Sequence, residues 1–433
     1  MRAKAPCARL VLGLILGVVV SCHTAVVSAQ TDTSGAVWLH FGAGHSDNIR
    51  RVLISPVSGS FTAFGVQSDL DYESSRVAVD FQSDLERRNY STSDLSDETY
   101  GFAYLDAEID AVPDRFAWLV RDRFSQGRID PFGVSTPENR AEVNVFSTGP
   151  RFDLPFGSRS AFRLELLKGE RSVSDLIGLD GDSTDRALSY VRSLDSITEL
   201  AVSITSQDIE YDLSGAEYET ERAFVSYTKA LASGRAYLAV GTTKTKFESE
   251  SMTTPYLNLS WSRDIGARSR VGVDAVQQYV DFFSDFRIGS SSETLLNDDI
   301  YKQQLLSVSY AIDGERNSLS IGYLDTDVDY VFSTETDYSQ DEFDIEFSHS
   351  LTRQGVVRVG YGIAERDYSL VSRGERFSRI RLAYEQALGR KFSLRAEYES
   401  HDNEGVREGV AIDEDVFRLS LRYAIYRDAP QSD

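Results

Sequence analysis

Cysteine, histidine and proline are scarce in this sequence, and each shortage excludes a class of protein. Its 433 residues include only two cysteines, Cys7 and Cys22, so neither a disulfide framework nor a thiolate metal cluster is expected. The five histidines are too few and too scattered to favour a multi-histidine metal site. Nine prolines argue against a proline-rich disordered chain.

Long apolar runs and a positive charge are also missing. Beyond the first thirty residues the longest strictly apolar runs, such as Phe116–Val120 and Ala236–Val240, are far shorter than the roughly twenty residues of a transmembrane helix. The formal net charge is −23, which argues against a protein that binds nucleic acid through its phosphates. The sequence therefore predicts neither a helical membrane protein nor a nucleic-acid partner.

The N-terminus resembles an export signal. Arg2, Lys4 and Arg9 precede the apolar stretch Leu10–Val20, which is too short to span a bilayer as a helix. We expect a signal peptide over residues 1–29, cleaved after Ala29, and the alternative is lipidation at Cys22. Cleavage after Ala29 removes three positive charges and takes the net charge from −23 to −26.

The remaining chain alternates between apolar and polar residues instead of forming helical stripes. Phe392, Leu394, Ala396 and Tyr398 alternate with polar or charged residues, and the same pattern recurs over Phe417–Tyr423. A period of two is typical of a strand with one apolar and one polar face. The pattern continues along the whole mature chain.

Short and long connections alternate strictly between these predicted strands. Nine short turns are expected near 73–74, 110–114, 155–159, 194–196, 231–235, 264–268, 313–316, 351–355 and 388–391. Ten longer polar connections separate them, at 49–58, 88–97, 127–140, 171–184, 208–219, 246–254, 281–299, 329–340, 367–375 and 401–414. Outer-membrane barrels have short periplasmic turns and long extracellular loops. We therefore predict an all-β fold, a closed antiparallel transmembrane β-barrel of 18–20 strands with 20 favoured, in one domain over residues 30–433 with strands from about 36 to 426.

Aromatic residues near strand ends favour this barrel over a soluble propeller or sandwich, which would also alternate. Aromatic girdles at both membrane interfaces would produce such a placement. The residues assigned to the girdles are Tyr90, Tyr100, Phe124, Tyr211, Tyr256, Tyr279, Tyr310, Tyr368, Tyr398 and Tyr423. The alternative explanation for these aromatic residues is their general preference for β-strands.

One central segment also resembles a known family. Its motifs are Trp118, Asp122, Phe124 and Gln126, then Asp130-Pro131-Phe132, Thr136–Arg140, Asn144-Val145-Phe146 and Thr148-Gly149-Pro150, with a weaker match at His45–Ile49. Over about residues 115–156 the sequence resembles the PEP-CTERM-system-associated outer-membrane β-barrel family, which occurs alongside exopolysaccharide biosynthesis and exosortase genes. The resemblance implies an outer-membrane location and a role in exopolysaccharide export or surface retention.

Catalytic, cofactor and metal sites are not predicted. His40, His45, His349 and His401 lie outside any recognisable nucleophile motif, and no Gly-x-Ser-x-Gly elbow or phosphate-binding loop occurs. Two acidic groups, Asp180/Asp182/Asp185 and Asp325/Asp327/Asp329, have oxygen ligands suited to calcium or magnesium. Neither has the full calcium-loop pattern, so solvated loop acids are the favoured interpretation.

Strand phase predicts which side chains face lipid and which face the lumen. Lipid-facing residues should include Val79, Phe81, Leu164, Val202, Ile345, Leu382, Leu394 and Leu419. The inward positions of the last strands carry the pore-lining candidates Arg358, Arg381, Arg395, Arg418 and Arg422. These arginines would form either a charged track that recognises carboxylates, phosphates or sugar hydroxyls or an interior ion-pair network. A lumen of about twenty strands is too wide for its own side chains to fill, so we expect water along the inner wall.

Two functions follow from these features. The first is an outer-membrane barrel that assists exopolysaccharide export or retention, and the second is a general diffusion porin or solute channel without a polymer role. The expected partners are outer-membrane lipid and lipopolysaccharide, with an anionic polysaccharide and its export machinery in the first case. The sequence predicts no enzyme and no cofactor.

Overall fold

The computed structural model describes residues 32–52, 55–91, 95, 97–130, 139–174, 179–212, 217–247, 250–281, 294–295, 299–370, 374–405 and 411–427. The predicted signal peptide, residues 1–29, lies outside this part of the chain. No helix of the described residues is both long and apolar enough to cross a membrane. Strands account for nearly all of the regular structure.

The strands run in chain order around the wall. They are β1 (Asp32–Ser46), β2 (Gly59–Glu73), β3 (Val77–Tyr90), β4 (Glu98–Val112), β5 (Phe116–Arg128), β6 (Arg140–Pro155), β7 (Ser160–Val173), β8 (Gly181–Ser193), β9 (Thr198–Tyr211), β10 (Glu217–Leu231), β11 (Gly234–Phe247), β12 (Glu250–Asp264), β13 (Ser269–Asp281), β14 (Thr294–Leu295), β15 (Ile300–Asp313), β16 (Asn317–Tyr330), β17 (Tyr338–Ser350), β18 (Gly355–Tyr368), β19 (Gly374–Ala387), β20 (Phe392–Glu404) and β21 (Ala411–Arg427).

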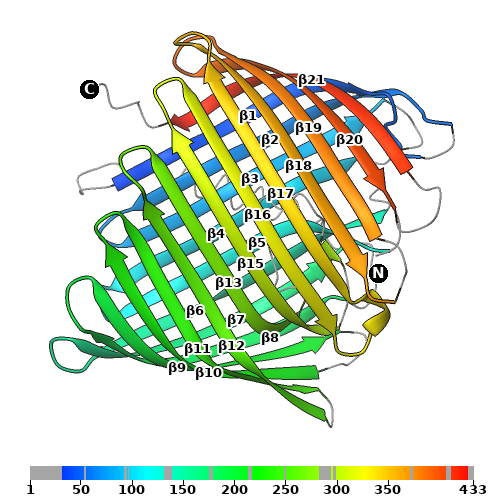
Figure 1. The fold of residues 1–433 in the computed structure, drawn as a ribbon. Coiled ribbons are helices and arrows are strands. Elements are labelled where there is room, and N and C mark those ends of the chain that lie inside the picture. Colours follow the sequence, from blue (N-terminus) through cyan, green and yellow to red (C-terminus); the bar gives the residue numbers. More distant parts are fainter. Residues whose placement is uncertain are drawn as a thin grey trace.

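The described strands close into a single antiparallel barrel (Figure 1). Each wall strand pairs with the next, β13 pairs directly with β15, and β21 pairs with β1 to close the sheet. The two-residue strand β14 is set apart from the wall, because it pairs in parallel with Gly127 and Arg128 of β5. Without β14 the wall has twenty strands, as the sequence predicts.

All nine short turns lie where the sequence places them. The turn from β19 to β20, for example, is closed by the Leu388 N–H, which donates to the Phe392 carbonyl at 2.7 Å. Gly389 in this turn has φ +103° and Gly157 in the turn before β7 has φ +75°. Glycine adopts this left-handed region without a steric penalty, so these residues allow the tight reversals at the short-turn end.

The outer face carries most of the predicted lipid-facing residues. Val202, Leu382, Leu394 and Leu419 are exposed on it. Leu164 pairs directly with Phe152 and Leu188, and Ile345 with Ile321 and Tyr361. Since directly paired residues share a face, and Phe152, Leu188 and Tyr361 are exposed, Leu164 and Ile345 also point outward.

Val79 and Phe81 behave differently from the other six. Their register places them on the same side of the sheet as the exposed Phe64, but they are only 7 % and 4 % exposed. They belong to a cluster of buried apolar residues from β1–β5, which also includes Leu70 and Leu105. Their contact with lipid therefore stays a prediction.

The girdle assignment is wrong for three of the tyrosines. Tyr211, Tyr256 and Tyr368 are buried inside the barrel. There they contact other side chains. The Tyr211 and Tyr218 ring centroids are 6.1 Å apart, the Tyr368 and Tyr338 centroids are 6.2 Å apart in an edge-on arrangement, and Tyr256 lies beneath a guanidinium at 4.4 Å. Strand-end aromatics are thus used for interior packing here, which their spacing alone does not distinguish from an interfacial position.

A closed wall with an apolar outer face suits a bilayer, because each wall strand pairs with both of its neighbours over most of its length and leaves few backbone groups unpaired. Figure 1 shows the strands at the front of the view crossing those at the back at a steep angle, as strands tilted within a barrel wall do. The chain is a β-barrel protein of the bacterial outer membrane.

The interior differs from the expected open lumen. At the end opposite the short turns, residues of facing walls touch: Ile300 of β15 packs with Val143, Ile209 and Tyr218 of β6, β9 and β10. The lumen width expected from about twenty strands assumes a circular cross-section. Where opposite parts of the wall touch, the lumen is narrower than this estimate.

Candidate functional site

The five predicted pore-lining arginines all lie on the inner face. Each alternates along its strand with an outward apolar residue, such as Val359 beside Arg358 and Leu394 beside Arg395. The charged side chains of Arg358, Arg381, Arg395, Arg418 and Arg422 therefore gather inside the wall made by β18–β21. Their role in lining a pore stays a prediction.

Each of these arginines has a carboxylate partner. Glu385 of β19 accepts from Arg358 at 3.0 Å and from Arg422 at 2.9 Å. Glu397 of β20 contacts Arg381 at 2.5 Å and Arg395 at 2.6 Å. One carboxylate thus serves two guanidinium groups in both cases. This arrangement is the interior ion-pair network that the sequence left open as the alternative to a free track.

Glu86 is the centre of a second group of charges, which sequence reasoning missed. Its carboxylate lies 3.2 Å from His40 of β1, 2.6 Å from Arg88 on its own strand, and 3.0 Å from Arg418 of β21. Closure of β21 onto β1 brings these residues together although Glu86 and Arg418 are 332 positions apart. No local sequence signal indicates such a meeting.

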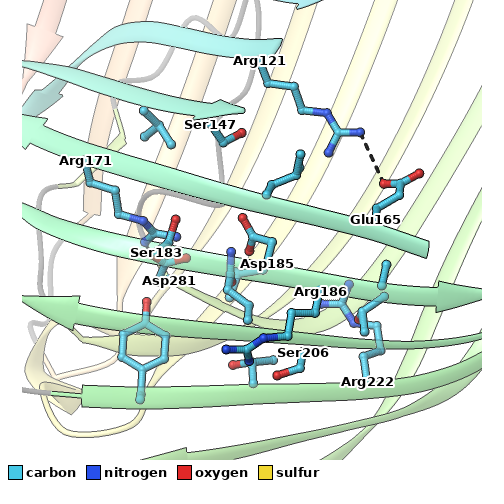
Figure 2. A pocket seen from close by; sticks show the side chains of 18 of the residues that line it. Arg121, Ser147, Glu165, Arg171, Ser183, Asp185, Arg186, Ser206, Arg222 and Asp281 are labelled. Carbon is cyan, nitrogen blue, oxygen red and sulfur yellow. Dashed lines mark hydrogen bonds and ion pairs between the residues drawn. The ribbon is translucent and has the colours of Figure 1, made fainter. Parts of the chain in front are cut away.

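A cavity of about 390 Å³ lies farther round the barrel, against β5–β10 and the outer end of β13. Figure 2 shows arginines, carboxylates and serine hydroxyls around it. Its inward cations are Arg121, Arg123, Arg171 and Arg222. The register and the exposed ion pair with Asp208 place Arg186, which also borders the cavity, on the outer face. We call this space the arginine chamber.

Two of the chamber arginines lack an acidic partner among the described residues. Arg222 donates to Thr243 Oγ1 at 3.3 Å and to Gln278 Oε1 at 3.2 Å, and it lies 4.4 Å over the Tyr256 ring. Arg123 lies over the Tyr104 ring at 5.4 Å. By contrast Arg121 is near Asp106 and Glu165 at 3.4 and 3.9 Å, and Arg171 pairs with Asp281.

The surroundings of Arg222 are neutral and polar, because the same stretch of wall supplies Thr205, Gln207 and Thr220. Such groups donate and accept hydrogen bonds without cancelling the positive charge. A guanidinium offers a planar fork of donors to a carboxylate or phosphate. The chamber therefore combines an uncompensated cation with partners for hydroxyl groups.

A second cavity of about 440 Å³ lies inside β1–β4 and is bordered by Trp38, Gln67, Asp84 and Arg422. Arg422 spans it, with the guanidinium 4.7 Å over the Trp38 ring and hydrogen-bonded to Gln67. Of the predicted arginines, Arg422 borders this cavity. The predicted track and the arginine chamber occupy different parts of the wall.

The predicted acidic groups do not converge. Asp180 accepts the Val173 N–H at 2.9 Å, Asp182 lies 3.9 Å from Lys168, and Asp185 borders the arginine chamber. Asp329 lies 3.4 Å from Lys302. Among the described residues no three histidines, cysteines or acids are arranged to hold a metal ion.

The four histidines of the mature chain stand apart from one another. His45 contacts Ser60 at 3.1 Å and His349 contacts Asn317 at 2.6 Å. His40 and His401 contact Glu86 and Glu399 at 3.2 and 3.6 Å. In the part of the chain that the structure describes, no histidine joins a serine to a carboxylate as a nucleophilic triad requires.

No protein-family model matches the chain, and no curated protein matches it. Solved outer-membrane structures resemble it at low identity. OccAB3 of Acinetobacter baumannii is 9 % identical, with 91 % of this chain and 99 % of that chain covered and a TM-score of 0.41. The siderophore receptor PirA of the same organism is 8 % identical, with 90 % and 80 % covered and a TM-score of 0.48.

OpdQ of Pseudomonas aeruginosa is 10 % identical, with 91 % of this chain and 99 % of that chain covered and a TM-score of 0.43. These TM-scores lie below 0.5, and the identities do not exceed 10 %.

Proposed function

We propose that the barrel is a non-enzymatic channel for small anionic solutes that carry hydroxyl groups, and that the arginine chamber is where they bind. The observation that carries this proposal is Arg222, an inward cation with only neutral partners. Fixed charges along a lumen set ionic selectivity. An arginine without a carboxylate partner attracts an anion, whereas Arg358, Arg381 and Arg395 are already neutralised by glutamates.

The test is ion selectivity of the purified barrel in a planar bilayer with a KCl gradient. Arg222→Gln removes the charge and keeps a hydrogen-bonding side chain, so the reversal potential should shift towards cation selectivity. Arg376→Gln is the matched control, because Arg376 lies on the outer face of β19 and is paired with Glu365 at 3.5 Å. An unchanged reversal potential in Arg222→Gln would refute the chamber as the selective site.

A second candidate function is assistance in exopolysaccharide export or surface retention. The segment that resembles the exopolysaccharide-associated barrel family, about residues 115–156, forms β5 and β6. These strands contribute Arg121, Arg123 and Ser147 to the chamber. The resembling segment therefore forms part of the chamber wall, and a polysaccharide with carboxylates and hydroxyls has the chemistry that the chamber fits.

The two candidates differ in their effect on the cell. If the barrel serves polymer export, deleting its gene lowers the amount of secreted polysaccharide, and expression of the wild-type chain restores it. If it is a solute channel alone, secretion is normal in the deletion strain while uptake of small anionic sugars falls. Lipopolysaccharide and the export machinery remain proposed partners in the first case.

A further inference from the structure

At two places around the wall, neighbouring strands stop pairing before they reach the outer end of the barrel, which is the end opposite the short turns. The β4–β5 ladder stops at the pair Ala103 and Phe124. The β12–β13 ladder stops at the pair Leu257 and Gln277. Beyond these pairs the outer parts of β4 and β12 are bonded to a wall strand on one side only. We call these two places the seams.

Side chains fill both seams in place of backbone pairs. At the first seam the Gln126 side-chain amide of β5 donates to the Thr99 carbonyl of β4, and β14 covers the exposed edge of β5 at Gly127 and Arg128. At the second seam Arg222 of β10 donates to Gln278 of β13 while it stacks on Tyr256 of β12. Pro255 of β12 has no backbone N–H to offer to a partner strand.

The seams bound a panel of strands, β5–β12, whose outer end crosses the lumen. Arg128 of β5 bonds both carboxylate oxygens of Glu375 of β19, at 2.7 and 2.9 Å. On the shorter way round the wall, β4, β3, β2, β1, β21 and β20 separate these strands. Arg171 of β7 pairs with Asp281 of β13, and Figure 2 shows these two side chains next to each other at the chamber.

The charged side chains of both pairs are deeply buried. The side chains of Arg128 and Glu375 are 2 % and 5 % exposed, and those of Arg171 and Asp281 are 2 % and 1 % exposed. Taking an ion pair out of water offsets most of its attraction, so such contacts hold two surfaces together without a large gain in stability. The apolar contacts of Ile300 lie beside them.

We propose that the outer end of the barrel is a gate. The β5–β12 panel moves against the rest of the wall about the two seams, and the pairs Arg128–Glu375 and Arg171–Asp281 are the latches that hold it closed. This inference rests on the proposed channel function, and it assigns regulation to the route by which solute reaches the arginine chamber. Arg222 touches both the chamber and one seam, so a bound anion competes with its contact to Gln278.

The test links the first latch covalently. Arg128→Cys/Glu375→Cys in the mature chain is treated in bilayers with a bifunctional thiosulfonate whose spacer matches an arginine–glutamate pair, and mass spectrometry verifies the link. We expect conductance to fall at least tenfold on linking and to recover on reduction. Arg376→Cys/Glu365→Cys is the control, because this directly paired couple is one residue away on the outer face, and its linking should leave conductance unchanged.

A second variant removes the latch without a reagent. Glu375→Gln leaves Arg128 and Arg366 close together without the carboxylate that both approach, Arg366 at 3.9 Å, so the open fraction should rise severalfold over wild type. Unchanged conductance in the linked double variant and an unchanged open fraction in Glu375→Gln would together overturn the gate. A closed linked variant with normal selectivity in Arg222→Gln would instead keep the gate and refute the anion chamber.

Discussion

At the scale of single residues, neighbouring positions on one strand face opposite sides of the wall, one towards lipid and one towards the lumen. Leu394 of β20 is 39 % exposed on the outer face, whereas the side chain of Arg395 is 12 % exposed and contacts Glu397 at 2.6 Å. We expect Leu394→Arg to lower the free energy of unfolding by about 2–4 kcal/mol if the position is near the bilayer midplane. Arg395→Ala should still assemble, since Glu397 keeps Arg381 as a partner.

Urea titrations of both variants in lipid vesicles measure these free energies. The opposite ranking, with Arg395→Ala failing to insert and Leu394→Arg stable, would mean that the strand register is wrong by one residue, because a one-residue slip exchanges the two faces.

The alternation of apolar and polar residues predicts which face of the sheet a side chain lies on, but it does not predict the contacts of that side chain. The inward direction of Arg418 follows from the alternation over Phe417–Tyr423, yet its partner Glu86 lies on β3, across the closure of β21 with β1. Arg128 and Glu375 are likewise 247 positions apart. Charge partners of this kind depend on barrel shape, so the sequence predicted the inner arginines and missed the latches and Arg222.

At the scale of elements, one glycine marks where β4 leaves β5. Gly101 has φ +111°, and a Cβ there would meet the Asp84 carbonyl oxygen. Only glycine adopts such a conformation readily. We expect Gly101→Ala to destabilise the barrel by about 1–3 kcal/mol from backbone strain alone, with the clash against β3 adding to this loss.

Gly322→Ala is the matched control, since no atom lies within 4 Å of a Cβ added in β16. It should be neutral or stabilising by up to about 1 kcal/mol, because alanine loses less backbone entropy on folding. The measurement is the urea midpoint of each variant after refolding. Equal midpoints for both variants would show that the position of β4 does not depend on the positive φ of Gly101.

Turns were the most predictable elements. Sequences such as Leu388–Lys391 and Asp264–Arg268 combine a glycine with polar neighbours between two alternating strands, and local chemistry fixes them. The strands extend farther into the long connections than predicted, as with β8, which begins at Gly181. Strand β14 was missed because two residues inside the connection 281–299 carry no periodicity, and only the uncovered edge of β5 gives them a partner.

At the scale of the whole molecule, strand number was predictable and interior shape was not. Alternation and connection length report the local environment of each strand, so they give twenty strands and the direction of each face. The contacts of Ile300 with Ile209 and of Arg171 with Asp281 depend on how far facing walls approach. At the two seams the backbone pairing ends although the alternation of apolar and polar residues continues, so the sequence gives no sign of them.

The distribution of charge over the whole barrel leads to a last prediction, on salt. Exposed carboxylates line the outer face near the outer end of β16–β21: Asp327, Asp329, Asp341, Glu365, Asp367, Asp402, Glu404, Asp413 and Asp415. They repel anions approaching from outside, whereas Arg222 attracts them within the barrel. The Debye length shortens from about 10 Å at 0.1 M to about 3 Å at 1 M salt, and buried charges are screened less than exposed ones.

Raising the salt should therefore weaken the repulsion at the rim more than the attraction in the chamber. We expect the ratio of anion to cation permeability to increase between 0.1 M and 1 M KCl at a constant gradient, and reversal potentials measure it directly. In Arg222→Gln the ratio should be lower than in the wild type at each salt concentration, because the inner attraction is lost, and it should still increase with salt, because the rim is intact. A wild-type ratio that declines steadily with salt would contradict this prediction, because it would mean that the attraction by Arg222 is screened more strongly than the repulsion at the rim.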